Sequence, residues 1–166
     1  MSYIDTSIIV AALDPQDPRF KKARALLEEE GDKVISEVVL AELASIVARR
    51  EGITSSIASR LGLSREEALI AILLYILKRF NLRYKSIENT TRLPLIGKVY
   101  RPIATAVELA PRAKLRTLDL LHVAYVKLMK NGGEPIRKLV TADSDFKKAR
   151  RLLKEEVCID LHIITC

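Results

Sequence analysis

The chain has 166 residues, which is enough for one domain with a sizeable buried core. Hydrophobic residues make up 49% and charged residues 30% of it, which excludes a disordered chain, and its longest apolar run, Ala68 to Leu77, is too short to cross a membrane. A net charge of +7 favours a polyanionic partner such as nucleic acid, although charge alone fits simple solubility equally well.

Short apolar segments alternate with longer amphipathic segments along the whole chain. The short segments predict buried strands at 3–4, 34–35, 84–87, 138–141 and 161–165. The longer segments predict helices at about 8–13, 17–30, 38–50, 54–61, 64–80, 101–110, 118–130 and 144–155. We expect Gly52 to break the third helix, Ser64 to cap the fifth, and the stretch around Pro94, residues 89–97, to form a loop.

This alternation of strands and helices predicts an α/β fold. Buried apolar strands that are joined by helices form parallel sheets, and the helices cover both faces of such a sheet. We therefore expect three layers, α/β/α, in a single domain of residues 1–166, with a longer helical and loop segment at about 52–100. In sheets of this kind, functional sites form beyond the carboxyl ends of the strands.

Acidic residues occur at positions where a parallel sheet could bring them together. Four of them lie at predicted strand ends or within apolar segments, namely Asp5, Glu42, Asp119 and Asp143. Three of the four have apolar neighbours, where an isolated carboxylate is costly to desolvate. A fifth, Asp145, follows Asp143 closely. If the fold gathers these side chains, their mutual repulsion favours either bound protons or a divalent cation.

Each acid also has an ordinary explanation when it is taken singly. Asp5, Asp119 and Asp143 could each cap a helix or stabilise its first turn. Glu42 is harder to explain in this way, because it lies within a predicted helix between Leu40 and Leu43, where an unpaired carboxylate is unexpected. The combination of the four therefore favours a shared function over four separate structural roles.

Oxygen ligands without histidine or cysteine in ligand spacing favour a hard cation such as Mg²⁺ or Mn²⁺. Such an ion polarises phosphoryl oxygens and lowers the pKa of water, which is the chemistry of phosphodiester hydrolysis. Basic residues near the acidic motifs are candidates for contacts with RNA phosphates: Arg116, Lys147, Lys148 and Arg150. The same cations would fit a solvated helix face equally well.

Four short motifs, in this order, resemble the PIN-domain nucleases and especially the VapC-like proteins. The motifs are YIDTS, VVLAELASI, LRTLDLLHVAYV and LVTADSDF, and the resemblance covers residues 2 to about 164. It implies a five-stranded sheet of order 3-2-1-4-5, with the strand that carries Asp5 in the middle. It also implies a divalent-metal-dependent endoribonuclease that leaves 5′-phosphate and 3′-hydroxyl ends.

The resemblance also assigns roles to individual residues. The catalytic and metal-binding acids would be Asp5, Glu42, Asp119 and Asp143, with Asp145 as a further metal ligand. The residues that support these carboxylates through hydroxyl groups would be Thr6, Ser7 and Thr141. His122 follows Asp119 by one helical turn, and we interpret it as a structural residue or one that holds a ligand in place.

Several functions remain open at this point. The resemblance favours the toxin of a toxin–antitoxin pair, with RNA as substrate and an antitoxin as partner. The alternatives are a housekeeping RNA-processing nuclease without an antitoxin, and an inactive PIN-like module that binds RNA or serves as a scaffold. A response-regulator-like protein with a Mg²⁺ site is disfavoured, because Glu42 and Asp119 lie on helices.

Association and location can also be predicted. The helix at Ala68 to Leu77 is apolar nearly all round, which indicates a homodimer. Cys158 and Cys166 have no metal-ligand spacing, and a buried Cys158 with a terminal thiol fits a reducing compartment. Asp5 interrupts the apolar start of the chain, so we expect no signal peptide and a cytoplasmic protein.

Overall fold

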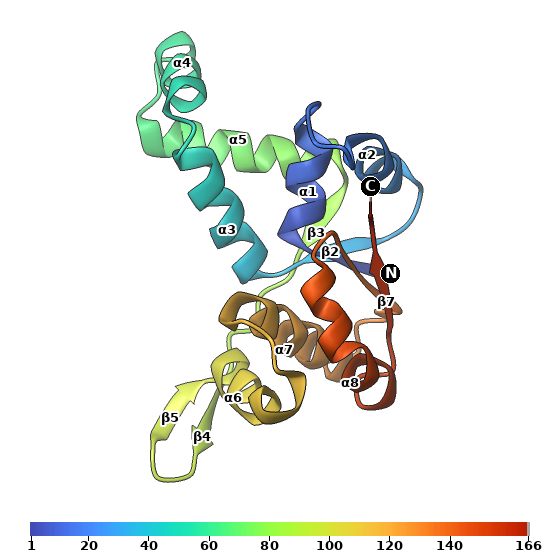
Figure 1. Ribbon diagram of the computed structural model, residues 1–166. Helices are drawn as coiled ribbons and strands as arrows, with labels where there is room; N and C mark the ends of the chain where they lie inside the picture. The colour runs from blue at the N-terminus through green and yellow to red at the C-terminus, as the bar shows by residue number, and fades with distance from the viewer. Residues whose placement is uncertain (166) are drawn as a thin grey trace.

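Five parallel strands form the centre of the protein, which a computed structural model describes over residues 1–165 (Figure 1). The sheet has the order β3-β2-β1-β6-β7, and β4 and β5 pair separately as an antiparallel hairpin. The strands are β1 (Ser2–Ile4), β2 (Lys33–Ile35), β3 (Leu82–Tyr84), β4 (Thr90–Leu93), β5 (Gly97–Tyr100), β6 (Lys138–Thr141) and β7 (Asp160–Ile163). The predicted order 3-2-1-4-5 is confirmed, since β6 and β7 are the fourth and fifth strands of the sheet.

Helices cover both faces of the sheet, as the three-layer prediction required. In the view of Figure 1, α1, α2 and α5 lie on one side of it, and α6 and α7 lie on the other. The helices are α1 (Thr6–Leu13), α2 (Phe20–Glu28), α3 (Glu37–Ala48), α4 (Glu51–Leu61), α5 (Arg65–Arg79), α6 (Arg101–Ala113), α7 (Thr117–Asn131) and α8 (Arg150–Glu155). Within residues 1–165, no helix is both long and apolar enough to cross a bilayer.

The central strands are buried because both of their faces meet helices. Tyr3 and Ile4 of β1 have no exposed surface, and neither have Leu139 and Val140 of β6. β1 pairs with β6 from Ser2↔Lys138 to Ile4↔Val140, so both strands end at the same edge of the sheet. The residues that follow these two strands are therefore brought together by the register itself.

The main departure from the sequence prediction is the β4–β5 hairpin, which replaces a loop. Leu95 at its tip and Gly97 both have positive φ, of 64° and 105°. Those two residues let the chain reverse after Pro94, so Thr90–Leu93 can pair with Gly97–Tyr100. Pro94 lies in the turn between the two strands and interrupts neither of them.

Smaller differences lie at the ends of elements. Gly52 lies inside the first turn of α4, where its backbone freedom costs little, and the break after α3 is at Arg50. The segment Ser144–Ala149 is a 3₁₀-helix that precedes α8, so the predicted single helix is in two parts. Ser64 does cap α5, in a capping box with Glu67.

Cysteine burial was predicted wrongly. Cys158 is exposed, because its left-handed backbone (φ 54°) turns its side chain outward while both neighbours, Val157 and Ile159, are buried. Cys166 lies outside the described residues.

Candidate active site

Asp5 lies at the centre of the acidic group. It follows β1 and occupies the N-cap position of α1, yet its carboxylate makes no capping hydrogen bond. Its side chain instead turns toward β6, where Oδ2 accepts hydrogen bonds from the hydroxyls of Ser7 and Thr141 (2.6 Å for Thr141). Asp5 is only 5% exposed, so these hydroxyls replace water around a buried carboxylate.

Glu42 reaches the same place from α3. Its Oε2 accepts a hydrogen bond from the Thr6 hydroxyl and lies 3.0 Å from His122 Nε2. Burial would raise the pKa of Glu42, but the hydrogen bonds from His122 and Thr6 outweigh burial and lower it. The Glu42 carboxylate, which was unexpected among apolar residues of a helix, therefore points into the acidic group.

His122 joins the two carboxylates. Its Nε2 lies 3.1 Å from Asp5 Oδ1 as well as 3.0 Å from Glu42 Oε2, and its ring is fully surrounded by protein. Burial opposes the charged imidazolium, but the hydrogen bond to Glu42 and the charges of Asp5, Glu42 and Asp119 together raise the pKa of His122. Since both carboxylates accept, Nε2 carries a proton toward them.

The other nitrogen of His122 is held by a relay of hydroxyl groups. Nδ1 lies 2.9 Å from the Tyr3 hydroxyl, which lies 2.6 Å from Ser36 Oγ. Burial keeps the pKa of Tyr3 well above its usual value, so the phenol stays protonated. The sequence did not indicate Tyr3 or Ser36 as part of the site. A hydroxyl on a fully buried strand, which must find a partner, was the available signal for Tyr3.

Asp119 lies in the first turn of α7, close enough to the other acids to interact with them. Burial raises the pKa of its carboxyl to about 6, with further contributions from Asp143, Asp5 and Asp145 that exceed the opposing charge of His122. Its Oδ2 is buried and has no hydrogen-bond partner among residues 1–165. An unpartnered anionic oxygen that faces other carboxylates is an arrangement that a cation would relieve.

Asp143 and Asp145 complete the group at its outer edge. Asp143 follows β6 and accepts a hydrogen bond from the backbone N–H of Asp145 (2.8 Å). The carboxylate of Asp145 contacts Lys148 at 2.9 Å and Arg116 at 3.7 Å, and these cations lower its pKa. Two of the four cations predicted for RNA contact therefore already face an acid of the group.

The predicted acids are thus gathered at one edge of the sheet, but not equally tightly. Ligand atoms of Asp5, Glu42 and His122 lie within 4.8 Å of one another, and within the described part of the chain this is the group that could hold a metal ion at such spacing. Asp119 and Asp143 lie outside that tight group; Asp119 interacts with it through the charges of Asp5 and His122, and Asp143 interacts with Asp119. The hydroxyl of Thr6 contacts the Glu42 carboxylate, and those of Ser7 and Thr141 contact the Asp5 carboxylate.

Comparison with known proteins identifies the family. Residues 2–152 match the PIN domain, so the chain belongs to the PIN domain family, whose members are nucleases. A search of curated proteins gives no match.

Solved structures share the fold at low sequence identity. VapC20 of Mycobacterium tuberculosis, a toxin that cleaves the sarcin–ricin loop, is 20% identical with a TM-score of 0.57, covering 90% of this chain and 95% of its own. VapBC2 of Rickettsia felis, bound to a DNA fragment from its promoter, is 19% identical with a TM-score of 0.56, covering 99% and 100%. FitAcB of Neisseria gonorrhoeae is 17% identical with a TM-score of 0.58, covering 98% and 96%. The resemblance to the PIN-domain family drawn from the motifs is confirmed, and structures of VapC proteins share the fold.

The raised pKa of Asp119 predicts how stability depends on pH without metal. A carboxyl whose pKa is higher in the folded state loses its stabilising contribution as pH rises from about 4 through about 6. Asp119→Asn should remove this loss, so in EDTA the variant should gain roughly 1 kcal/mol over the parent at pH 7, after solvent screening of a partly exposed carboxyl, and little at pH 4. Urea unfolding at pH 4, 5, 6 and 7 measures the difference.

The matched control is Glu30→Gln, which removes an exposed carboxylate outside the acidic group. Its unfolding free energy should follow the parent at every pH. An Asp119→Asn curve that runs parallel to the parent over the whole range would contradict the electrostatic account of this site.

Proposed function

We propose that this protein is a divalent-metal-dependent endoribonuclease that acts as the toxin of a VapBC-type toxin–antitoxin pair. The observation that carries the nuclease proposal is the buried, unpartnered Oδ2 of Asp119 beside the charges of Asp5 and Asp143. Carboxylates that lack an internal partner and repel one another form a ligand set for Mg²⁺ or Mn²⁺. Membership of the PIN domain family and the VapC-like neighbours support the same reaction class.

The residues that would hold the cation follow two strands of the sheet or lie on two helices above its edge. They are Asp5, Glu42, Asp119 and Asp143, with Asp145 at the edge. A divalent cation bound by them would supply Lewis-acid chemistry, which stabilises charge on a phosphoryl oxygen and makes water more acidic. The chain's own part is to orient the ligands: Ser7 and Thr141 fix Asp5, and Thr6 fixes Glu42.

His122 would keep these ligands in place. Its Nε2 hydrogen bond to Glu42 and the relay through Tyr3 fix the ring, so both carboxylates are held in one geometry. Lys147 and Arg150 are exposed beside the acidic edge, and within residues 1–165 neither forms an ion pair. They, together with Arg116 and Lys148, are the cations that we assign to the RNA backbone near the site.

Removal of one ligand tests the catalytic proposal. Asp5→Asn should lower cleavage of a mixed RNA substrate at least about 100-fold in Mg²⁺ or Mn²⁺, because the metal would lose its most buried ligand. EDTA should abolish cleavage by the parent. A gel assay with end-labelled RNA measures both effects, and circular dichroism checks that the variant is folded.

Asp32→Asn is the matched control for this experiment. Asp32 directly precedes β2, so it lies at the opposite edge of the sheet from the acidic group. The same chemical change there should leave cleavage unaltered. Full activity of Asp5→Asn, or cleavage by the parent that persists in EDTA, would show that the assignment is wrong.

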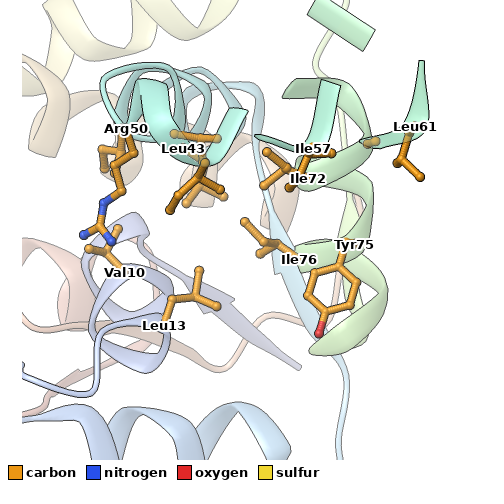
Figure 2. Close-up of a pocket in the computed structure, with 13 residues that line it drawn as sticks. Val10, Leu13, Leu43, Arg50, Ile57, Leu61, Ile72, Tyr75 and Ile76 are labelled. Carbon is orange, nitrogen blue, oxygen red and sulfur yellow. The ribbon is translucent and has the colours of Figure 1, made fainter. Parts of the chain in front are cut away.

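An apolar groove among four helices is the surface that we assign to an antitoxin. It has a volume of about 520 Å³, lies among α1, α3, α4 and α5, and is lined by Leu43, Ile57, Ile72 and other aliphatic side chains (Figure 2). Arg50 is the one charged residue among its lining residues. We assign the groove to an amphipathic helix of the antitoxin that lays its apolar face along these side chains, beside Arg50 and its ion-pair partner Asp14.

Substitution in the groove tests this partner. Ile57→Glu should prevent co-purification with a small protein encoded beside this one, because a carboxylate would lie in the apolar contact. It should leave RNA cleavage by the isolated protein unchanged, since Ile57 lies on α4, away from the acidic group. A complex that survives the substitution would contradict the assignment, and Val107→Glu, an exposed position on α6 outside the groove, is the control.

Self-association is assigned to a different stripe of α5. Ile70 and Leu74 are 57% and 51% exposed and lie one turn apart, whereas Ala68, Leu73 and Ile76 of the same helix are buried. The helix is therefore partly used by its own core and leaves an apolar strip outside. We propose that a second copy of this chain covers the strip in a two-fold dimer.

The dimer is tested by light scattering. Ile70→Glu/Leu74→Glu should convert a dimer into a monomer at micromolar concentration, because four carboxylates would meet at the two-fold contact. Arg60→Glu/Arg65→Glu, which are exposed charge reversals near the same helix, should leave the mass unchanged. A parent that has a monomer mass would sink the proposal.

A further inference from the structure

The β4–β5 hairpin is the feature that the nuclease proposal leaves without a purpose. It projects from the body beside α6 (Figure 1). Leu95 and Ile96 at its tip are 108% and 70% exposed, the two highest values among the exposed large hydrophobic residues. Two bare aliphatic side chains at the end of an arm are costly in water, so the tip is suited to a contact outside the described chain.

The hairpin also carries uncompensated positive charge. Arg92 and Lys98 are directly opposite each other in the antiparallel register, and both are exposed. Like charges in this position destabilise a hairpin, yet no acidic residue occurs between 89 and 107. Within residues 1–165, neither residue forms an ion pair, and neither does Arg101 at the end of the hairpin. This arrangement favours a polyanion.

The base of the hairpin is fixed to the elements that form the acidic group. Glu37, in the first turn of α3, accepts hydrogen bonds from the Tyr100 hydroxyl (2.7 Å) and from the backbone N–H of Ile87 (2.8 Å). The Tyr100 hydroxyl also lies 3.3 Å from that of Tyr125 on α7. Both anchors therefore belong to helices that carry Glu42 or His122.

These anchors join the base of the hairpin to the two helices that carry residues of the acidic group. Glu37 directly follows Ser36, which ends the relay through Tyr3 to His122. Tyr125 lies one turn beyond His122 on the same face of α7. Alternation along β5 puts Lys98 on the same face of the hairpin as Tyr100, the residue that reaches the body.

We propose that the β4–β5 hairpin is an arm that binds the RNA substrate outside the acidic group. Arg92, Lys98 and Arg101 would contact phosphates, and Leu95 with Ile96 would pack against exposed bases or riboses. This inference rests on the proposed ribonuclease function. Charge decides for RNA over a second copy of the chain, because the chain has a net charge of +7 and a copy would meet the arm with like charge.

Binding is measured separately from cleavage, in the Asp5→Asn background. The probes are a fluorescein-labelled stem-loop RNA and a labelled single strand of the same length, titrated by anisotropy at several salt concentrations. Arg92→Ala/Lys98→Ala should weaken binding about tenfold, and it should reduce the slope of log affinity against log salt by roughly 1.4 for two phosphate contacts. Leu95→Ser/Ile96→Ser should weaken binding without changing that slope.

Arg60→Ala/Arg65→Ala is the matched control, since it removes two exposed cations from the far end of the molecule, at α4 and α5 (Figure 1). Its affinity and salt slope should equal those of the Asp5→Asn parent. Thermal melts of all variants check that the hairpin changes leave the body folded.

The outcomes separate the arm from the nuclease proposal. If Asp5→Asn binds RNA and both hairpin variants bind equally well, the arm is refuted while the ribonuclease proposal stands. If the hairpin variants keep their RNA affinity but change from dimer to monomer in light scattering, the tip is a protein contact and the inference is wrong. A parent that neither binds nor cleaves RNA overturns both proposals.

Discussion

The repulsion among buried carboxylates is the constraint on which the rest of the site depends. Asp5 and Glu42 approach each other because His122 Nε2 lies between them, 3.1 and 3.0 Å from their oxygens. Three hydroxyl side chains and a relay through Tyr3 then fix the charged groups in place. Within residues 1–165 the Oδ2 of Asp119 has no such partner, and burial, with the charges of Asp143 and Asp5, raises the pKa of this carboxyl. A divalent cation bound among these oxygens would balance their charge.

The parallel sheet brings these charges together and stabilises the fold that holds them. β1 and β6 end together, so Asp5, Thr141 and Asp143 arrive at one edge without any long connection. Helices α3 and α7 bring Glu42 and Asp119 over the same edge, and their apolar faces pack on a core that contains Ile4, Ile35 and Val140. The stability that the acids remove is offset by burial elsewhere in the sheet. Function at this edge therefore depends on a rigid scaffold beneath it.

The segment between Glu42 and Asp119 adds surfaces that the acidic group does not require. It contributes α4 and α5, which with α1 and α3 enclose the apolar groove, and the β4–β5 hairpin with its bare tip. The two features differ in chemistry, since the groove is aliphatic with one cation and the hairpin is basic with an apolar end. A protein partner suits the first and a polyanion suits the second. Glu37 joins the hairpin to the catalytic edge through Tyr100.

The sequence by itself determined the alternation of layers and the acids at strand ends, because period and burial are local properties of a pattern. The strand order followed from the resemblance of its motifs to the PIN-domain nucleases. It could not find the pairing of Thr90–Leu93 with Gly97–Tyr100, since the turn depends on the backbone of Leu95 and Gly97. It placed His122 near the site without showing that the ring bridges Asp5 and Glu42. That contact joins residues 80 or more positions apart, so only the tertiary structure decides it: distances across a sheet are set by packing and register, which no single segment encodes.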